Sequence, residues 1–320
     1  MKKAAIVGFG AVAPNHAAGI LKSENVVLSA ICDCDFEKAV KATEIYGGQA
    51  FSNYDEMLES GIDTVHICTP HYLHFEMAEK AVKKGIEVIL EKPVTMLKEE
   101  FEKLLPYKDK ISIMFQNRRN NSVTVLKEFL ETEDLGQLKE VEAKLLWHRD
   151  KAYYDSADWR GKLSTEGGGV LINQAIHTLD LCLYIGGKAK SVTAKVENRT
   201  LKNVIEVEDT IDAELTFENG AKASFYATNG NETNEPIYIK YVFEKATFEY
   251  LDNALYRDGV QIIHDDSATF GKDYWGTGHE KVIKEYYEKD KKISIDNTEN
   301  TMKAVFAMYE SAKQGKEVLL

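Results

Sequence analysis

Three consecutive glycines, Gly167 to Gly169, precede a stretch that carries Asn173 and His177. Glycine allows the backbone to adopt strained dihedral angles or to approach another group closely. The apolar residues that follow recur at helical spacing, and Asn173 and His177 lie four positions apart on another face of the same helix. We therefore predict a helix on which Asn173 orients a substrate hydroxyl and His177 takes its proton. The alternative is that His177 is a core or boundary histidine.

A carboxylate and an ammonium follow a short apolar run at 87–90, in the sequence Glu91-Lys92-Pro93. Lys92 could donate to the alkoxide oxygen that develops when a carbinol is oxidised. Glu91 could orient either a cofactor or Lys92. The alternative for Lys92 is a surface lysine in front of a turn proline.

A glycine-rich turn follows the short apolar run at 3–7, which is typical of a buried strand. The turn reads Gly8-Phe9-Gly10-Ala11-Val12-Ala13 and fits the G-x-G-x-x-G/A pattern of dinucleotide-binding turns. The first glycine makes the tight turn, the second lets the backbone approach a pyrophosphate, and the third small residue packs the helix on the strand. We expect the turn to bind a dinucleotide through Gly8, Phe9, Gly10, Val12 and Ala13.

An acidic residue, Asp33, ends the next apolar run at 26–32. It lies about twenty residues beyond the glycine turn, where a carboxylate that binds the ribose hydroxyls is expected. Such a carboxylate repels a 2′-phosphate, so Asp33 favours NAD over NADP. The alternative is that Asp33 only caps a helix that starts near Asp35.

Apolar runs and helical patterns alternate through the first part of the chain, which predicts a doubly wound parallel sheet. Strands are expected at 3–7, 26–32, 64–68, 87–90 and 111–115, and helices at 36–46, 54–60, 74–84 and 98–105. Ligands of such sheets bind beyond the carboxyl ends of the strands. The residues just past these ends are Gly8, Asp33, Thr69, Pro70, Glu91, Lys92 and Asn117.

The pattern changes after residue 118, where longer strands predict a second, largely antiparallel α+β domain. Strands are expected at 138–147, 191–199, 210–217, 222–227, 237–243, 247–251 and 261–264, with helices at 123–130, 280–287 and 301–312. We therefore divide the chain into a dinucleotide-binding domain, 1–118, and a substrate-binding and oligomerisation domain, 119–320. The C-terminal helix is a candidate to pack back on the first domain. An open sheet of this kind often buries its free face in a partner subunit.

A polar and aromatic loop at 148–164 is the candidate for substrate recognition. Aromatic rings such as Tyr153 and Trp159 suit the C–H faces of sugars, and arginine suits hydroxyls or a carboxylate. Arg160 could instead reach the cofactor. The alternative for Trp147 and Trp159 is burial in the core.

Composition excludes several classes of protein. The 320 residues carry a net charge of −12, which disfavours binding to nucleic acid or to anionic membranes. The four cysteines lie in apolar or strand-like contexts, which predicts buried free thiols in a reducing cytoplasm. The first thirteen residues resemble a signal peptide, but the dinucleotide turn explains Gly8 and Gly10 better.

A metal site is not expected. His66, His71 and His74 are close in sequence, but His66 falls in the middle of a predicted strand and need not converge with the other two. No cysteine stands at a spacing that would complete a zinc site.

Taken together, these motifs resemble the Gfo/Idh/MocA oxidoreductases, the relatives of glucose-fructose oxidoreductase and inositol dehydrogenase. The resemblance covers the whole chain and lies in four motifs: Gly8-x-Gly10-x-x-Ala13-x-x-His16, Thr69-Pro70-x-x-x-His74, Glu91-Lys92-Pro93, and Gly167-Gly168-Gly169-x-Leu171-x-Asn173-x-x-x-His177-x-x-Asp180. Gly278-His279-Glu280 and Tyr309-x-Ser311 match as well. It implies an NAD(P)-dependent sugar or polyol dehydrogenase that forms a homodimer or homotetramer through its open sheet.

The resemblance also implies roles for single residues. Lys92 and His177 would carry the chemistry, and His74 would belong to the cofactor site. Many members have Asp where this chain has Asn173, and an amide adds no charge beside a histidine. A cofactor-binding sensor or scaffold without turnover is therefore the alternative function.

Overall fold

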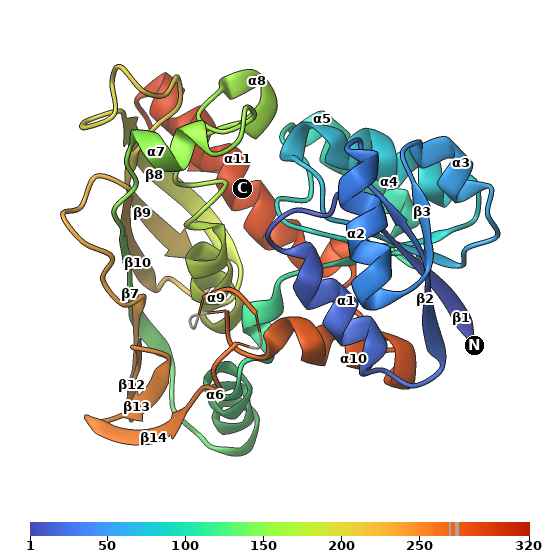
Figure 1. Ribbon diagram of the computed structural model, residues 1–320. Coiled ribbons are helices and arrows are strands. Elements are labelled where there is room, and N and C mark those ends of the chain that lie inside the picture. The colour runs from blue at the N-terminus through green and yellow to red at the C-terminus, as the bar shows by residue number, and fades with distance from the viewer. Residues whose placement is uncertain (269, 273–274) are drawn as a thin grey trace. The chain divides into compact units, whose positions relative to one another are not determined.

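The computed structural model describes residues 1–268, 270–272 and 275–320 (Figure 1). These residues group into two compact units. The first comprises Met1–Arg119 and Ser267–Thr298, and the second comprises Asn120–Asp266 and Glu299–Leu320. The first unit is thus built from two separate parts of the chain, whereas the predicted division at residue 118 is a single break. The roles assigned to the two domains, dinucleotide binding and substrate binding with oligomerisation, stay predictions.

The first unit contains a six-stranded sheet in the order β3-β2-β1-β4-β5-β6. All of its strand pairs are parallel. The strands are β1 (Lys2–Val7), β2 (Val26–Cys32), β3 (Gln49–Phe51), β4 (Thr64–Ile67), β5 (Glu87–Leu90) and β6 (Ile111–Ile113). Helices cover both faces of such a sheet, so its central strands are buried runs, as Ala4 to Val7 and Val88 to Leu90 are. The predicted doubly wound sheet is confirmed.

The helices of the first unit follow from the direction of its crossovers. The chain moves one way across the sheet from β1 to β3 and the other way from β4 to β6, which places the connecting helices on opposite faces. A later helix, α10, packs against α1. The α-helices are α1 (Ala13–Leu21), α2 (Phe36–Tyr46), α3 (Tyr54–Leu58), α4 (His74–Lys83), α5 (Lys98–Leu104) and α10 (Gly278–Lys289). Single 3₁₀ turns are η1 (His71–Leu73), η2 (Leu105–Tyr107), η3 (Gln116–Arg119) and η5 (Ile295–Thr298).

The second unit contains a nine-stranded sheet in the order β14-β13-β12-β11-β7-β10-β9-β8-β15. Its strand pairs are antiparallel except for β7 and β10, which run parallel. The strands are β7 (Leu138–Leu146), β8 (Ala189–Glu197), β9 (Thr210–Phe217), β10 (Lys222–Thr228), β11 (Tyr238–Phe243), β12 (Thr247–Leu251), β13 (Ala254–Arg257), β14 (Val260–His264) and β15 (Val318–Leu319). The predicted second, mainly antiparallel sheet is confirmed.

Helices pack on one face of this sheet, as Figure 1 shows for α9 and α11. Tyr241 of β11 donates a hydrogen bond to the carbonyl of Leu181 at 2.9 Å, and Thr301 of α11 donates to Asp180 of α9 at 2.7 Å. The helices of this unit are α6 (Asn121–Thr132), α7 (Lys151–Asp155), α8 (Leu163–Glu166), α9 (Ile176–Gly186) and α11 (Glu299–Gln314). The last long helix, α11, therefore belongs to the second unit.

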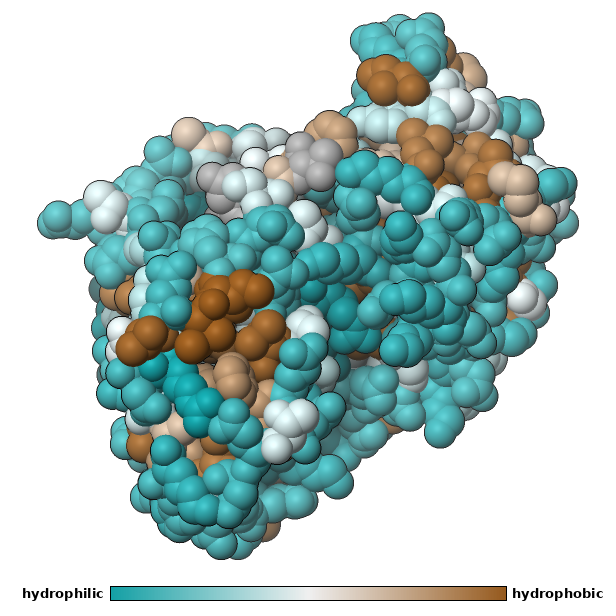
Figure 2. All heavy atoms as spheres, turned by 90° about the horizontal axis from the view of Figure 1, so that it is seen from below, coloured by the Kyte–Doolittle hydropathy of each residue, from teal (hydrophilic) through white to brown (hydrophobic). Residues whose placement is uncertain are grey.

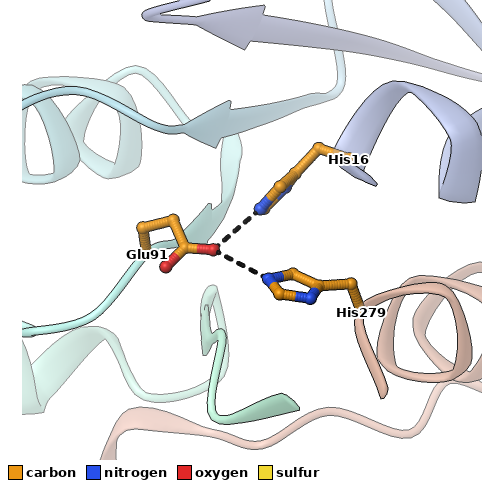
Figure 3. Close-up of side chains that lie close together, drawn as sticks. All are labelled: His16, Glu91 and His279. Atoms are coloured by element: carbon orange, nitrogen blue, oxygen red, sulfur yellow. Dashed lines mark hydrogen bonds and ion pairs between the residues drawn. The ribbon is translucent and has the colours of Figure 1, made fainter. Parts of the chain in front are cut away.

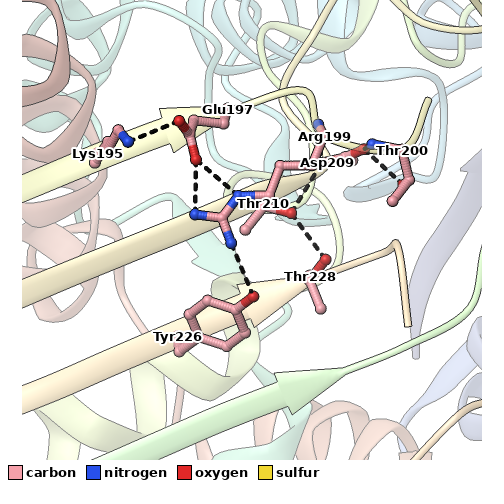
Figure 4. A network of polar contacts seen from close by, with 8 residues as sticks. All are labelled: Lys195, Glu197, Arg199, Thr200, Asp209, Thr210, Tyr226 and Thr228. Carbon is pink, nitrogen blue, oxygen red and sulfur yellow. Dashed lines mark hydrogen bonds and ion pairs between the residues drawn. The ribbon is translucent and has the colours of Figure 1, made fainter. Parts of the chain in front are cut away.

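A buried carboxylate organises the connection between β8 and β9 (Figure 4). Asp209 accepts hydrogen bonds from the backbone nitrogens of Arg199 and Thr200 at 2.9 and 2.7 Å, and from the hydroxyl of Thr210 at 2.8 Å. Burial alone raises the pKa of Asp209, but these donors outweigh it and hold the pKa below its ordinary value. These bonds hold the backbone of the β8–β9 connection around Asp209, the residue that follows Glu208.

Three details of the sequence-based prediction are wrong. The substrate helix α9 begins at Ile176, so Asn173 lies in the turns before it. The loop at 148–164 contains the short helices α7 and α8. Cys34 is exposed, whereas the other three cysteines are buried free thiols.

The surface offers no sign of a membrane-spanning helix: within the described ranges, no helix is both long and apolar enough to cross a bilayer. Hydrophilic residues cover most of the face in Figure 2, and hydrophobic residues gather there in separate patches.

Candidate active site

The turn after β1 has two glycines that face different surroundings. Gly8 has a φ of +81°, and a Cβ there would stand 2.8 Å from Thr69 and 2.9 Å from the Cys68 backbone. A Cβ on Gly10 would meet no protein atom within 4 Å. Ala13, in contrast, is fully buried at the start of α1. The protein's own packing requires glycine at Gly8, while the space at Gly10 can admit an outside group such as a pyrophosphate.

Asp33 connects the end of β2 to this turn. Its Oδ2 accepts a hydrogen bond from the backbone nitrogen of Phe9 at 2.7 Å, and its Oδ1 accepts from Asp35 at 3.0 Å. The ammonium of Lys38 stands 3.8 Å from Oδ2. The residue that caps α2 is Asp35, which accepts from the backbone nitrogen of Lys38. The capping role proposed as the alternative for Asp33 therefore belongs to Asp35.

Buried amide atoms without a hydrogen-bond partner among the described residues of this unit include Oδ1 of Asn117, in the turn after β6, and Nδ2 of Asn15, in the first turn of α1. Buried polar atoms are almost always satisfied, so these two atoms can bond to a water or to a polar group from outside the protein. Both amides suit a polar cofactor. Asn117 was among the predicted cofactor-binding residues, whereas Asn15 was not.

His74 ties two loops of the same sheet edge together. It is fully buried, and its Nδ1 and Nε2 lie 2.7 Å from the carbonyl oxygen of Pro93 and 2.9 Å from that of Thr69. Burial lowers the pKa of His74, although both carbonyls oppose this. Both ring nitrogens thus face the protein's own backbone. A direct contact of His74, Thr69 or Pro70 with the cofactor stays a prediction.

Glu91 lies in a buried cluster with two histidines (Figure 3). Its Oε1 is 3.0 Å from Nε2 of His16 and 3.5 Å from Nε2 of His279, and its Oε2 accepts from the backbone nitrogen of Lys92 at 3.2 Å. Burial alone raises the pKa of Glu91, but the hydrogen bonds from His16 and His279 outweigh it and hold the pKa well below its ordinary value. Glu91 is therefore ionised, and both of its carboxylate oxygens have partners that fix its orientation.

Two of the three consecutive glycines of the second unit lie against other parts of that unit, Gly169 against Glu208 and Gly168 against Tyr309. A Cβ on Gly169 would stand 1.8 Å from the carbonyl oxygen of Glu208, and one on Gly168 would stand 2.0 Å from the hydroxyl of Tyr309. The carboxylate of Glu208 accepts from the backbone nitrogens of Gly169 and Leu171 and from the Tyr309 hydroxyl. Burial raises the pKa of Glu208 to about 7 against these donors. Gly168 and Gly169 are therefore required by packing against the protein's own residues, Tyr309 and Glu208, and not by a ligand.

Asn173 is held by a carboxylate rather than by the helix that was predicted for it. Its Nδ2 donates to Oε1 of the fully buried Glu166, whose Oε2 accepts from the backbone nitrogen of Gly161. The backbone nitrogen of Ala175 bonds to the carbonyl of Val170, five residues back, so the segment before α9 is irregular. The partly exposed His177 follows in the first turn of α9. Both residues belong to one short segment, but not to one helix face.

Tyr153 lies among cations in the candidate substrate loop. The guanidinium groups of Arg149 and Arg160 stand 5.1 and 4.4 Å from its ring centre, and Arg160 also stands 4.9 Å from that of Trp159. Gln174 donates to the Tyr153 hydroxyl at 3.0 Å, which connects the loop to the glycine segment. Tyr153, Trp159 and Arg160 are partly exposed, while Trp147 is buried. The core interpretation thus holds for Trp147 and not for Trp159.

The three histidines weighed as metal ligands do not converge. His71 and His74 have ring centres 5.8 Å apart, but His66 bonds to His16 and Tyr287 instead. In the part of the chain that the structure describes, the group of potential ligands is His16, Glu91 and His279. The motifs of the resembled family include two of these three ligands, His16 and His279, in addition to Glu91.

Comparison with known proteins agrees with this geometry. Residues 2–117 match the model "Oxidoreductase family, NAD-binding Rossmann fold", and residues 123–249 match "GFO/IDH/MocA C-terminal domain". The chain is 26% identical over 215 residues to glucose-6-phosphate 3-dehydrogenase of Bacillus subtilis (strain 168), covering 65% of this chain. It spans only 60% of the length of that relative.

Two further proteins resemble more of the chain. Levoglucosan dehydrogenase of Pseudarthrobacter phenanthrenivorans is 26% identical over 286 residues, which cover 79% of this chain and 73% of that protein. The WlbA dehydrogenase from Bordetella pertussis, solved in complex with NADH and UDP-GlcNAcA, aligns with a TM-score of 0.86 at 27% identity and covers 100% of this chain and 99% of that one. With both domain models matched in order, the chain belongs to the Gfo/Idh/MocA family of oxidoreductases, whose N-terminal domain is an NAD-binding Rossmann fold.

Proposed function

We propose that this protein is an NAD-dependent dehydrogenase that transfers a hydride between nicotinamide and a hydroxyl or keto carbon of a sugar, polyol or sugar derivative. The observation that supports it most is the polar edge of the first unit. Gly8, Asp33, Thr69, Glu91 and Asn117 follow β1, β2, β4, β5 and β6, at the edge where ligands of doubly wound sheets bind. The relatives named for glucose-6-phosphate and levoglucosan support the substrate class.

The residues of this chain would act as follows. Bound NAD supplies the hydride acceptor, and Gly10, Asp33, Asn15 and Asn117 are the residues that would hold it. Lys92 donates to the developing alkoxide oxygen, and His177 takes the hydroxyl proton. Asn173, oriented by Glu166, positions a neighbouring hydroxyl. Tyr153 and Trp159 offer faces to a sugar ring, and Arg160 offers a guanidinium to a hydroxyl, a carboxylate or the cofactor.

The first experiment is a titration with NADH and NADPH, followed by energy transfer from tryptophan. We expect NADH to bind more tightly, and binding of neither nucleotide would overturn the proposal. A panel of sugars, sugar phosphates, uronates and polyols then identifies the substrate.

Variants test the two reactive residues. Lys92→Ala and His177→Ala should each lower kcat/KM by about 100-fold or more, because each removes a proton donor or acceptor of the reaction. Lys98→Ala and His264→Ala, on the exposed surfaces of the same two units, are matched controls. His177→Ala should keep its affinity for NADH.

A non-catalytic sensor or scaffold is the second candidate, and the amide at Asn173 is the feature that favours it. It would bind NADH and transfer no hydride across the whole panel. The intact pair Lys92 and His177 favours the enzyme.

We also propose a cytoplasmic homodimer or homotetramer assembled through the nine-stranded sheet. The face opposite α9 and α11 carries opposite charges side by side, such as Lys240 with Glu249 and Lys144 with Glu142, which can complement a second copy. The free cysteines support a reducing compartment. Light scattering of the wild type and of Lys240→Glu measures the assembly, and a wild-type monomer would contradict it.

A further inference from the structure

A continuous row of buried polar side chains crosses the first unit. The hydroxyl of Tyr287, in α10, lies 2.8 Å from Nε2 of His66, in β4. Nδ1 of His66 lies 2.9 Å from Nδ1 of His16, in α1, and Nε2 of His16 lies 3.0 Å from Oε1 of Glu91. All four residues are buried, and His16 and His66 have no exposed surface. The row therefore ends on the carboxylate that precedes Lys92.

A second imidazole reaches the same oxygen from another helix. His279, in the first turn of α10, places its Nε2 3.5 Å from Oε1 of Glu91, as Figure 3 shows. Its ring lies 5.9 Å from that of His16 and 5.8 Å from that of Trp275. Two helices that are far apart in the sequence thus each direct one nitrogen at a single carboxylate oxygen.

The Tyr287 hydroxyl at one end of the row and the Glu91 carboxylate at the other determine which nitrogen of each histidine carries the proton. Burial raises the pKa of Tyr287, so its hydroxyl keeps the proton and can donate. Burial lowers the pKa of His66 and of His279, which favours neutral rings. A neutral ring has one N–H and one acceptor. Tyr287 then donates to Nε2 of His66, Nδ1–H of His66 donates to His16, and Nε2–H of His16 donates to Glu91.

We propose that Tyr287, His66 and His16 form a one-directional hydrogen-bond chain that, together with His279, keeps Glu91 ionised and thereby holds a fixed negative charge beside Lys92. These four are positioning residues, since they act on Lys92 only through Glu91. This role deepens the proposed dehydrogenase function and rests on it. The chain itself can be tested without any turnover.

The charges of Glu91 and Lys92 act on the same surroundings. Glu91 raises the pKa of His279 and of His74, and Lys92 lowers both, although burial is the largest influence on each. The two opposite charges therefore lie within electrostatic range of the same two rings. The negative charge of Glu91, on the residue directly before Lys92, therefore offsets the positive charge of the Lys92 ammonium.

Several elements place ionisable groups around Glu91, and any of these groups can contribute to the pH dependence of kcat/KM. They are His16 from α1, Cys68 after β4, His74 from α4, Lys92 from its own loop and His279 from α10. Burial, helped by Glu91, raises the pKa of the Cys68 thiol well above its ordinary value, so it stays neutral in the assay range.

The proton position on His66 tests the chain directly. Long-range nitrogen–proton correlation spectra distinguish the two tautomers of each ring, and single His→Gln variants assign the eight histidines. The proposal requires the proton on Nδ1 of His66 and on Nε2 of both His16 and His279. A proton on Nε2 of His66 would reverse the chain and overturn the proposal.

Two adjacent tyrosines of α10 provide a matched pair of variants. Tyr287→Phe removes the donor at the start of the chain, whereas Tyr286→Phe removes a hydroxyl that bonds to Glu87 at 2.8 Å. The tautomer signals of His66 should change in Tyr287→Phe and stay unchanged in Tyr286→Phe. Equal behaviour of the two variants would contradict the chain.

A metal ion is the competing explanation for this cluster, because the ligand atoms of His16, Glu91 and His279 lie within 4.8 Å of one another. An ion on Nε2 of His16 would move the ring proton to Nδ1 and reverse the chain. Elemental analysis of the purified protein, and calorimetric titration with Zn²⁺ alone, should find no stoichiometric binding. One tightly bound ion per chain would overturn the proposal.

The pH dependence of kcat/KM tests the effect on Lys92. Glu91→Gln should move the basic limb about one pH unit or more towards lower pH, because Lys92 loses its anionic neighbour. His279→Phe should add a loss of activity on the acidic side, as Glu91 becomes protonated, and His279→Gln, which restores an N–H donor, should remove it. In the Glu91→Gln background, His279→Phe should leave the profile unchanged. An unshifted basic limb in Glu91→Gln would overturn the proposed role of Glu91 beside Lys92. A protein that binds NADH and shows the expected tautomers, but oxidises no substrate, would overturn only the proposed dehydrogenase function.

Discussion

The carboxylate of Asp33 accepts a hydrogen bond from the backbone nitrogen of Phe9 at 2.7 Å, so the acid at the end of β2 holds the glycine turn after β1. Its two oxygens are both used by backbone nitrogens, and Lys38 stands 3.8 Å away. A substitution of Asp33 that tests cofactor preference must therefore keep an acceptor for at least one of these backbone nitrogens.

Asp33→Asn should narrow the preference for NADH over NADPH by about tenfold or more, since it removes the charge that repels a 2′-phosphate and leaves the ammonium of Lys38 in place. The amide can accept from only one of the two backbone nitrogens, so a loss of about 1 kcal/mol in unfolding free energy should accompany it. Fluorescence titration with both nucleotides measures the ratio. An unchanged ratio would exclude Asp33 from the ribose site.

Gly8 and Gly10 form a matched pair in the same turn. Gly10→Ala should leave the unfolding free energy nearly unchanged, because its Cβ meets no protein atom within 4 Å, but should weaken NADH binding by about tenfold or more. Gly8→Ala should lower the unfolding free energy by about 1–3 kcal/mol, because it combines a positive φ with contacts below 3 Å. Urea unfolding and NADH titration separate the effects. Normal NADH binding by Gly10→Ala would argue against a pyrophosphate there.

Asn173 and Glu166 should behave as a coupled pair. Asn173→Asp places a second carboxylate against the buried Glu166 and should destabilise the fold, because two like charges cannot both ionise at that distance. Glu166→Gln combined with Asn173→Asp reverses the polarity: the new amide donates to residue 173 and still accepts from Gly161. A double-mutant cycle by urea unfolding should show a coupling of about 1–3 kcal/mol. Strict additivity would mean that the two side chains do not interact.

Glu208 should make the stability depend on pH below neutrality. Its pKa is raised by burial from 4.5 to about 7, so its contribution to the unfolding free energy is complete below pH 4.5 and is lost as the pH rises to about 7. That difference corresponds to about 3 kcal/mol. Glu208→Gln does not titrate, so the wild type should lose stability relative to it across this window. A constant difference from pH 4.5 to 8 would show that the carboxyl is not held in its neutral form.

The sequence predicted the parts of the fold that depend on local patterns. Apolar runs and the glycine turn identified the parallel sheet and its polar edge, because both signals lie within a few neighbouring residues. Short strands without such a run, β3, β13 and β15, were missed. Cys34 is exposed although it lies only two residues beyond the buried end of β2, because the apolar run ends before it.

The partners of the site residues could not be read from sequence. The start of α9 was predicted too early, because Glu208 binds the backbone at Gly169 and Leu171 and shapes the segment before the helix. Glu166 and His279 likewise contact Asn173 and Glu91 only through tertiary structure. The motifs marked some of these positions, but chemical pattern alone did not say what each of them touches.

The first unit is completed by residues 267–298, and this affects how the protein is made. A ribosome releases the chain from its N-terminus, and domains generally fold as they emerge. Glu91 appears early, whereas His279 and Tyr287 leave the ribosome only after nearly all of the second unit has been synthesised. Until then the nascent Rossmann portion lacks the helix that supplies one donor to Glu91 and packs against α1. A fragment of residues 1–118 contains every strand of the parallel sheet but lacks His279. When this fragment is expressed alone, Glu91 should therefore lack one of its two histidine partners.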